Sequence, residues 1–161
     1  MTMTMPARIR LCLWAALLVT VTPPSAWAAS CTISNSGISF GAYDPLSADP
    51  RDTNATIQNT CVGSAGENVS FSVGVTEVSG SGSNLSLSNG SARLQYNLYL
   101  DAGRTVIWGD GTNGTSMIQD SLTIPSDSVS KNYTVYGRIF GGQFSTLPGV
   151  YVDQLVITVS Y

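Results

Sequence analysis

Apolar side chains recur at every second position in several short runs, and this period of two constrains the fold more than any other sequence feature. Such alternation is typical of strands with one buried face. The clearest runs are Val69, Phe71, Val73 and Val75; Leu94, Tyr96, Leu98 and Leu100; Tyr133, Val135 and Ile139 with Gly137 between them; and Leu155, Ile157, Val159 and Tyr161. Weaker strand candidates are 37–40, 53–61, 84–88, 105–108 and 121–125.

Turn-forming pairs such as Asn89-Gly90 and Pro148-Gly149 separate these runs, and no stretch of ten residues has the apolar spacing of an amphipathic helix. Many short strands in one chain predict an all-β domain. A β-sandwich is favoured, with a small barrel as the alternative.

The amino-terminal residues have the three parts of a secretory signal peptide. Arg8 and Arg10 carry the only charges, an apolar run follows at 11–21, and small residues end the segment at Ala28. We expect cleavage after Ala28, which divides the chain into a signal peptide (1–28) and one domain (29–161). The apolar run is about half the ~20 residues needed to cross a bilayer, so we expect an exported protein without a membrane anchor.

Removal of the signal peptide makes the chain more acidic. Arg8 and Arg10 leave while all ten acidic residues stay, so the net charge falls from −3 to −5. A surface of this sign argues against binding nucleic acid or anionic lipid. Cys12 also leaves, and Cys31 and Cys61 remain. In an oxidising compartment two cysteines predict one disulfide.

The residues needed for most catalytic and metal sites are missing. The chain has no histidine, which excludes the Ser-His-Asp and Cys-His nucleophiles and the usual zinc sites. Its only lysine, Lys131, lies at a polar strand entrance. Acidic residues such as Glu67 and Glu77 could supply a glycosidase pair, but their spacing selects none. We therefore expect no enzyme, cofactor or metal.

Trp108 and Asp110 offer a different kind of site. An exposed aromatic at Trp108 or Tyr43 could stack on sugars or on a solid surface, although core packing is the usual role of such a residue. The segment from Asp110 to Thr115 resembles a calcium loop but lacks alternating carboxylates, so turn chemistry is favoured. Trp108 and Asp110 are kept as a possible surface-binding site.

Several stretches in order resemble the spore coat protein U domain family, which includes subunits of archaic, Csu-type chaperone-usher pili. They are Cys31 to Ser34 followed by Ile38 to Pro45; Ile57 to Cys61; Arg93 to Asp101 followed by Val106 to Gly111; and Gly149 to Asp153 before the last alternating run. The resemblance covers essentially all of 29–161.

This resemblance implies an immunoglobulin-like sandwich that lacks its last strand. A periplasmic chaperone would hold the subunit until another pilus subunit supplies a strand at an outer-membrane usher, which is β-strand addition. The resemblance makes Leu155, Ile157, Val159 and Tyr161 the wall that the chaperone or donor strand contacts. The alternative is that this run is an ordinary closing strand of a complete sandwich.

The function implied is a secreted structural subunit of a surface pilus or coat that contributes to adhesion and biofilm formation. Polymerising pilins carry an alternating apolar donor segment before the first cysteine, whereas cleavage after Ala28 leaves only Ala29 and Ser30 there. This departure suggests a terminal or tip position, or a coat protein that does not polymerise. A self-sufficient secreted adhesin or lectin-like module is the alternative function.

Overall fold

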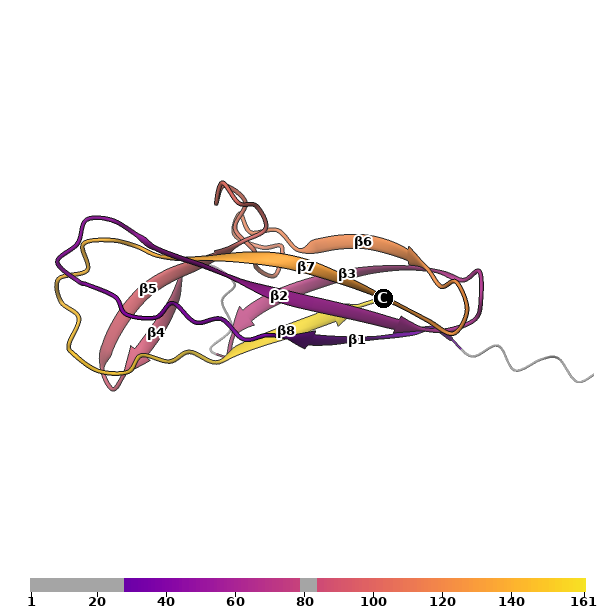
Figure 1. Ribbon diagram of the computed structural model, residues 1–161, viewed down its shortest axis with the longest axis horizontal. Helices are drawn as coiled ribbons and strands as arrows, with labels where there is room; N and C mark the ends of the chain where they lie inside the picture. The colour runs from indigo at the N-terminus through magenta and orange to yellow at the C-terminus, as the bar shows by residue number, and fades with distance from the viewer. Residues whose placement is uncertain (1–27, 79–83) are drawn as a thin grey trace, which may run out of the picture.

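The computed structural model describes residues 28–78 and 84–161. Within these residues its regular secondary structure consists of β-strands alone. These are β1 (Ser30–Asn35), β2 (Arg51–Val62), β3 (Asn68–Glu77), β4 (Leu85–Asn89), β5 (Ala92–Tyr99), β6 (Ile118–Thr123), β7 (Ser128–Ile139) and β8 (Leu155–Ser160). Figure 1 shows them in an elongated molecule with two layers.

The strands form two antiparallel sheets that face each other. One has the order β1-β2-β7-β5-β4 and the other the order β6-β3-β8. Side chains from both sheets fill one core, including Val73 of β3, Tyr96 of β5 and Val135 of β7, each at most 2% exposed. The predicted all-β sandwich is therefore confirmed.

The four clearest alternating runs are confirmed as β3, β5, β7 and β8. The weaker candidates at 53–61, 84–88 and 121–125 overlap β2, β4 and β6. The other two weaker candidates were wrong as strands: 37–40 forms none, and 105–108 makes only isolated bridges at Ile107 and Trp108. The alternation did not predict β1, because its six residues contain only two with buried or half-buried apolar side chains.

The predicted disulfide joins Cys31 to Cys61. These residues lie directly opposite each other in the ladder between β1 and β2, and both are buried. The bond therefore ties β1, an edge strand, to β2, which pairs with β7 over its whole length.

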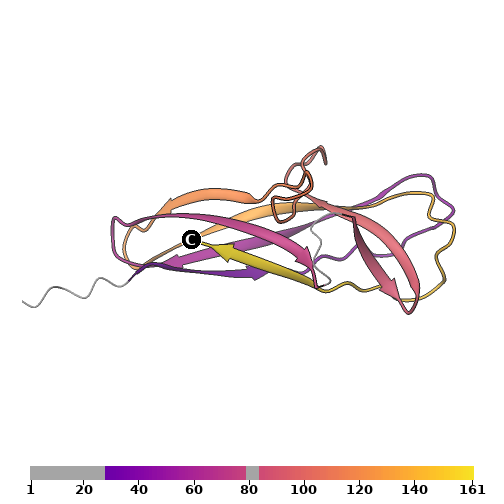
Figure 2. The same cartoon turned by 180° about the vertical axis from the view of Figure 1, so that it is seen from behind.

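Two long segments cover the end of the five-stranded sheet beyond the second sheet. They connect β1 to β2 and β7 to β8, and Figures 1 and 2 show both at the end of the molecule near β4 and β5. Gly137 of β7 makes room for the first segment, since a Cβ there would lie 2.6 Å from Ile38 Cδ1. The segments also bond to each other, as the Tyr43 hydroxyl donates to the Phe140 carbonyl at 2.8 Å.

No helix within the described residues is long and apolar enough to cross a membrane. The predicted signal peptide lies almost wholly outside the described residues, with Ala28 exposed at their start. Cleavage after Ala28 stays a prediction.

Candidate functional site

One edge of β8 has no strand beside it within the described part of the chain. β8 pairs only with β3, with Gly74 opposite Thr158 and Thr76 opposite Val156. The Val75 amide donates away from β8, to Gly109 O at 3.1 Å. Because hydrogen-bonding directions alternate along a strand, the even-numbered residues of β8 bond to β3. The amides and carbonyls of its odd-numbered residues point to the open edge.

The same odd-numbered residues point their side chains into the sandwich. Leu155, Ile157 and Val159 pack against the core but stay half-buried, and the residues between them are exposed. Their neighbours Val73 and Val75 on β3 are 0% and 1% exposed. The difference follows from the neighbours of each strand. β3 is flanked by β8 on one side and by β6 and the segment at Gly109 on the other, whereas among the described strands β8 is flanked only by β3.

The alternation between exposed and half-buried residues begins before β8. Exposure alternates without a break from Val150 to Ser160. The Val152 amide donates to Ser88 O at 3.0 Å and its carbonyl accepts from Ser88 N at 2.7 Å, so Val152 bonds to β4. The open edge thus runs through five odd-numbered residues, which we call the acceptor edge: Tyr151, Asp153, Leu155, Ile157 and Val159. No residue of the described ranges makes a backbone hydrogen bond with their amides or carbonyls.

A second wall faces the acceptor edge. It consists of β1 and the segment after it, whose side chains Ile33, Ile38 and Tyr43 are partly buried against the core. Figures 1 and 2 show β1 close to β8 in both views. Half-buried apolar side chains therefore line both sides of the open edge, and we call these two rows of side chains the groove.

A pocket of about 640 Å³ lies at the Tyr151 end of the acceptor edge. The pocket lies between residues 38–45 and 146–151, over side chains of β4, β5 and β7. Its lining residues are Ile38, Ser39, Phe40, Gly41, Ala42, Tyr43, Pro45, Leu87, Leu94, Ile139, Thr146, Leu147, Pro148, Gly149, Val150 and Tyr151. Most of them are apolar, so the pocket suits an apolar side chain.

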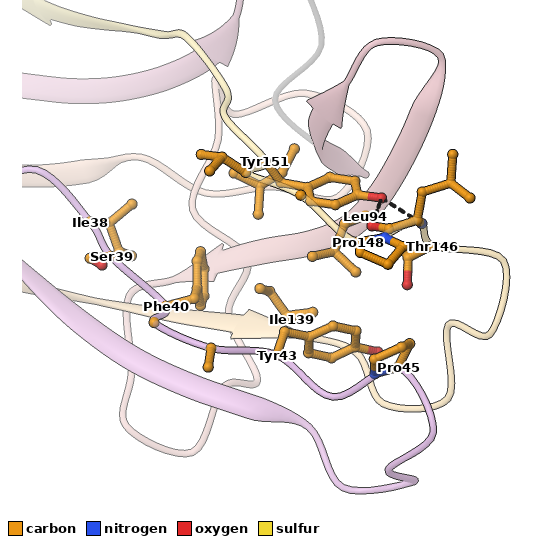
Figure 3. A pocket seen from close by; sticks show the side chains of 16 residues that line it. Ile38, Ser39, Phe40, Tyr43, Pro45, Leu94, Ile139, Thr146, Pro148 and Tyr151 are labelled. Carbon is orange, nitrogen blue, oxygen red and sulfur yellow. Dashed lines mark hydrogen bonds between the residues drawn. The ribbon is translucent and has the colours of Figure 1, made fainter.

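Three aromatic rings shape this pocket (Figure 3). The Tyr151 hydroxyl donates to Leu147 O and accepts from Leu147 N, both at 2.8 Å, which closes the loop before β8. Phe40 packs edge-on against Tyr96, with ring centroids 5.5 Å apart. The Tyr43 hydroxyl is bonded to Phe140, as described above, and it also accepts from Gln143 N at 3.2 Å. These bonds hold the rings in place without filling the space between them.

Asp153 is the one charged member of the acceptor edge. Its carboxylate accepts a hydrogen bond from the buried Tyr96 hydroxyl at 2.7 Å. Burial raises the pKa of Asp153 above its ordinary value, and the negative charge of Glu77 raises it further. Burial also raises the pKa of Tyr96, with the Asp153 bond as the next cause. A carboxylate therefore lies between the pocket and the apolar side chains of β8.

The structure separates Tyr161 from the other predicted wall residues. It lies beyond β8 and is 61% exposed, beside a shallow depression that Phe71 and Asp120 also border. Tyr161 does not line the 640 Å³ pocket, and neither do Leu155, Ile157 and Val159.

The surface-binding interpretation of Trp108 was wrong. Trp108 is 1% exposed, and its Nε1 donates to the Val73 carbonyl at 3.0 Å, so it is a core residue. Asp110 has a turn role, accepting from Thr112 N at 3.0 Å and from Thr112 Oγ1 at 2.7 Å. These bonds lower the pKa of Asp110. No cluster of metal-ligating side chains occurs within 28–78 or 84–161.

The sequence analysis did not identify the residues of the site that lie in or near the pocket. Tyr151 and Asp153 continue the alternation of β8 upstream, so the pattern could have identified them. Ile38, Phe40 and Tyr43 carry no comparable signal, since their segment forms no strand.

A model of the Spore Coat Protein U domain matches residues 14–158 of the chain. The chain belongs to this family. The match to the Spore Coat Protein U domain begins inside the predicted signal peptide. It includes every residue of the acceptor edge except Val159. No curated protein matches this family member. Among solved structures it is similar to the P pilus rod subunit PapA, with 18% identity and a TM-score of 0.44, over 81% of this chain and 98% of that chain.

Proposed function

We propose that this Spore Coat Protein U domain is a structural subunit of a surface pilus or coat, and that it joins its assembly by accepting a β-strand from another protein chain. The partners are a periplasmic chaperone during transit and another subunit after assembly at an outer-membrane usher. The proposal includes export to the cell surface and a contribution to adhesion and biofilm formation, with no catalytic activity.

The acceptor edge carries this proposal. Leu155, Ile157 and Val159 present unpaired backbone groups and half-buried apolar side chains along the same line. An edge of this kind promotes pairing with any available strand. A strand from a partner would supply the missing hydrogen bonds and bury the apolar side chains, which are the two energetic contributions of β-strand addition.

Proline substitution on the acceptor edge tests the proposal directly. The Ile157 amide points away from β3, so Ile157→Pro leaves the β3 ladder intact, as expected for proline on an edge strand. The substitution removes one amide that a partner strand requires. Ile157→Ala is the matched control, because it shortens the side chain and keeps the amide.

We expect co-expressed chaperone to co-purify with the Ile157→Ala variant and not with Ile157→Pro. Val159→Pro and Val159→Ala form a second pair, should proline at 157 prevent folding. Equal chaperone recovery with proline and alanine at both positions would show that this edge is not used.

The stability of the isolated chain gives a second test. An unfilled groove leaves apolar surface in contact with water, so the chain without a partner should aggregate or unfold readily. Addition of an alternating apolar peptide should raise its thermal midpoint. A monomer that unfolds cooperatively and gains nothing from such peptides would contradict strand acceptance.

A gene deletion tests the cellular part of the proposal. Loss of the chain should reduce surface attachment and biofilm mass, and re-expression should restore both. Re-expression of Ile157→Pro should fail to restore them while Ile157→Ala succeeds, because only the proline variant cannot accept a strand.

A further inference from the structure

The acceptor edge has a charge at a position where its neighbours are apolar. Tyr151 lies on one side of Asp153 and Leu155 on the other, and all three side chains point inward. An incoming strand would cover this row and remove Asp153 from water. Burial of an ionised carboxylate is costly unless an opposite charge or hydrogen-bond donors compensate for it.

The groups around Asp153 compensate for only part of this cost. Tyr96 of β5 donates one hydrogen bond at 2.7 Å, and the backbone amide of Gln154 donates another, also at 2.7 Å. The charge of Glu77 of β3 also acts on Asp153, and it is negative as well. No described cation pairs with the Asp153 carboxylate in an ion pair.

We propose that Asp153 selects the strand that the groove accepts, by pairing with a lysine or arginine that the partner strand places directly opposite it. This inference rests on the proposed function and adds a chemical requirement to the partner. The occupant is an extended segment of another chain, apolar at every second residue and basic at one of those positions.

The geometry of strand pairing fixes where the basic residue must lie. Residues directly opposite in an antiparallel pair have their side chains on the same face, with Cβ atoms about 4.5–5.5 Å apart. A strand antiparallel to β8 meets Val159 first and Tyr151 last, so its fourth inward-facing residue faces Asp153. A parallel strand meets the acceptor edge in the reverse order and places its second inward-facing residue there.

A position scan with synthetic peptides tests this pairing. Each peptide covers the acceptor edge with apolar residues at its five inward-facing positions, and lysine replaces one of them in turn. Matched peptides carry glutamine or glutamate at the same position. The exported chain is refolded with each labelled peptide, and the dissociation constant is measured by fluorescence anisotropy.

We expect a lysine optimum at the second or the fourth position and at no other. There lysine should bind about tenfold more tightly than glutamate, and also more tightly than glutamine, as expected for coupled neighbouring charges. In Asp153→Asn the preference should fall below about twofold. Asp127→Asn removes one negative charge at an exposed turn away from the groove, so it should leave the preference unchanged.

Two results would overturn the inference while strand acceptance stands. One is peptide binding without a preferred lysine position, and the other is a preference that persists in Asp153→Asn. The position scan on the unsubstituted chain decides the matter even if Asp153→Asn folds poorly. If no peptide binds, including the fully apolar one, strand acceptance itself fails and the selection by Asp153 fails with it.

Discussion

The Tyr96 hydroxyl donates a hydrogen bond to the Asp153 carboxylate at 2.7 Å, which connects the middle of β5 to the segment that leads into β8. The tyrosine is 1% exposed, so the carboxylate is drawn toward the core. The same contact fixes the acceptor edge against the five-stranded sheet and places a charge inside the groove.

Asp153 should make stability depend on pH in an unusual direction. Burial, and then the charge of Glu77, raise the pKa of Asp153, so the folded chain holds this proton more tightly than the unfolded chain. As the pH falls through the raised pKa toward 3.8, Asp153 should therefore increase the free energy of unfolding. Urea unfolding of the original chain and Asp153→Asn at several pH values measures this contribution. A constant difference between the two curves would contradict it.

Asp120 should make stability depend on pH in the opposite direction to Asp153. Hydrogen bonds from Lys131 and then Tyr133 lower the pKa of Asp120 to about 2. Its ionised form is therefore favoured in the folded chain, and the stability it contributes is present above pH 3.8 and lost as the pH falls toward 2. The acid loss of stability should be smaller in Asp120→Asn than in the original chain. An equally steep acid transition in both would contradict this role.

Trp108 should be required for stability and not for surface binding. Trp108→Ala leaves a cavity and removes the bond to the Val73 carbonyl, so the free energy of unfolding should fall by about 3–5 kcal/mol. Trp108→Phe fills more of the space and loses the bond, with an expected cost of about 1–3 kcal/mol. Chemical denaturation measures both. Loss of adhesion in a variant with unchanged stability would instead favour a binding role.

Gly137 should control the width of the groove. A Cβ at this position would lie 2.6 Å from Ile38 Cδ1 and 2.9 Å from two ring atoms of Phe40. Gly137→Ala should therefore push the wall formed by Ile38 and Phe40 toward the acceptor edge and weaken peptide binding severalfold. Gly90→Ala provides a control for destabilisation without a clash, since Gly90 lies in the turn between β4 and β5 with a left-handed φ of 58° and nothing near its Cβ. Equal peptide affinity in the original chain and Gly137→Ala would show that this wall is not part of the site.

The sequence predicted the strands that bury one whole face in the core better than it predicted the short edge strand β1. Alternation identified β3, β5, β7 and β8 because each has one face on the core, and burial of one face imposes a period of two. The two cysteines predicted the disulfide from composition and compartment alone. The short strand β1 depends on its ladder with β2, a long-range contact that local pattern does not contain.

The candidate site was predictable only in part. The residues Leu155, Ile157 and Val159 came from the family resemblance, and the structure places them inward along an open edge. Tyr43 was considered as a surface aromatic and instead lies in the wall of the pocket. Its position depends on hydrogen bonds to Phe140 and Gln143, which lie far away in the sequence.

The two walls of the groove come from opposite ends of the described chain. β1 and the segment after it form one wall, and the residues from Tyr151 to Val159 form the other. Folds that depend on contacts between such distant segments form more slowly than folds built on local contacts. Under the proposed function, a chain exported with its amino end first would present only one of the two walls until residues 151–159 had followed. A partner strand that needs both walls would then bind only a subunit whose translocation is nearly complete.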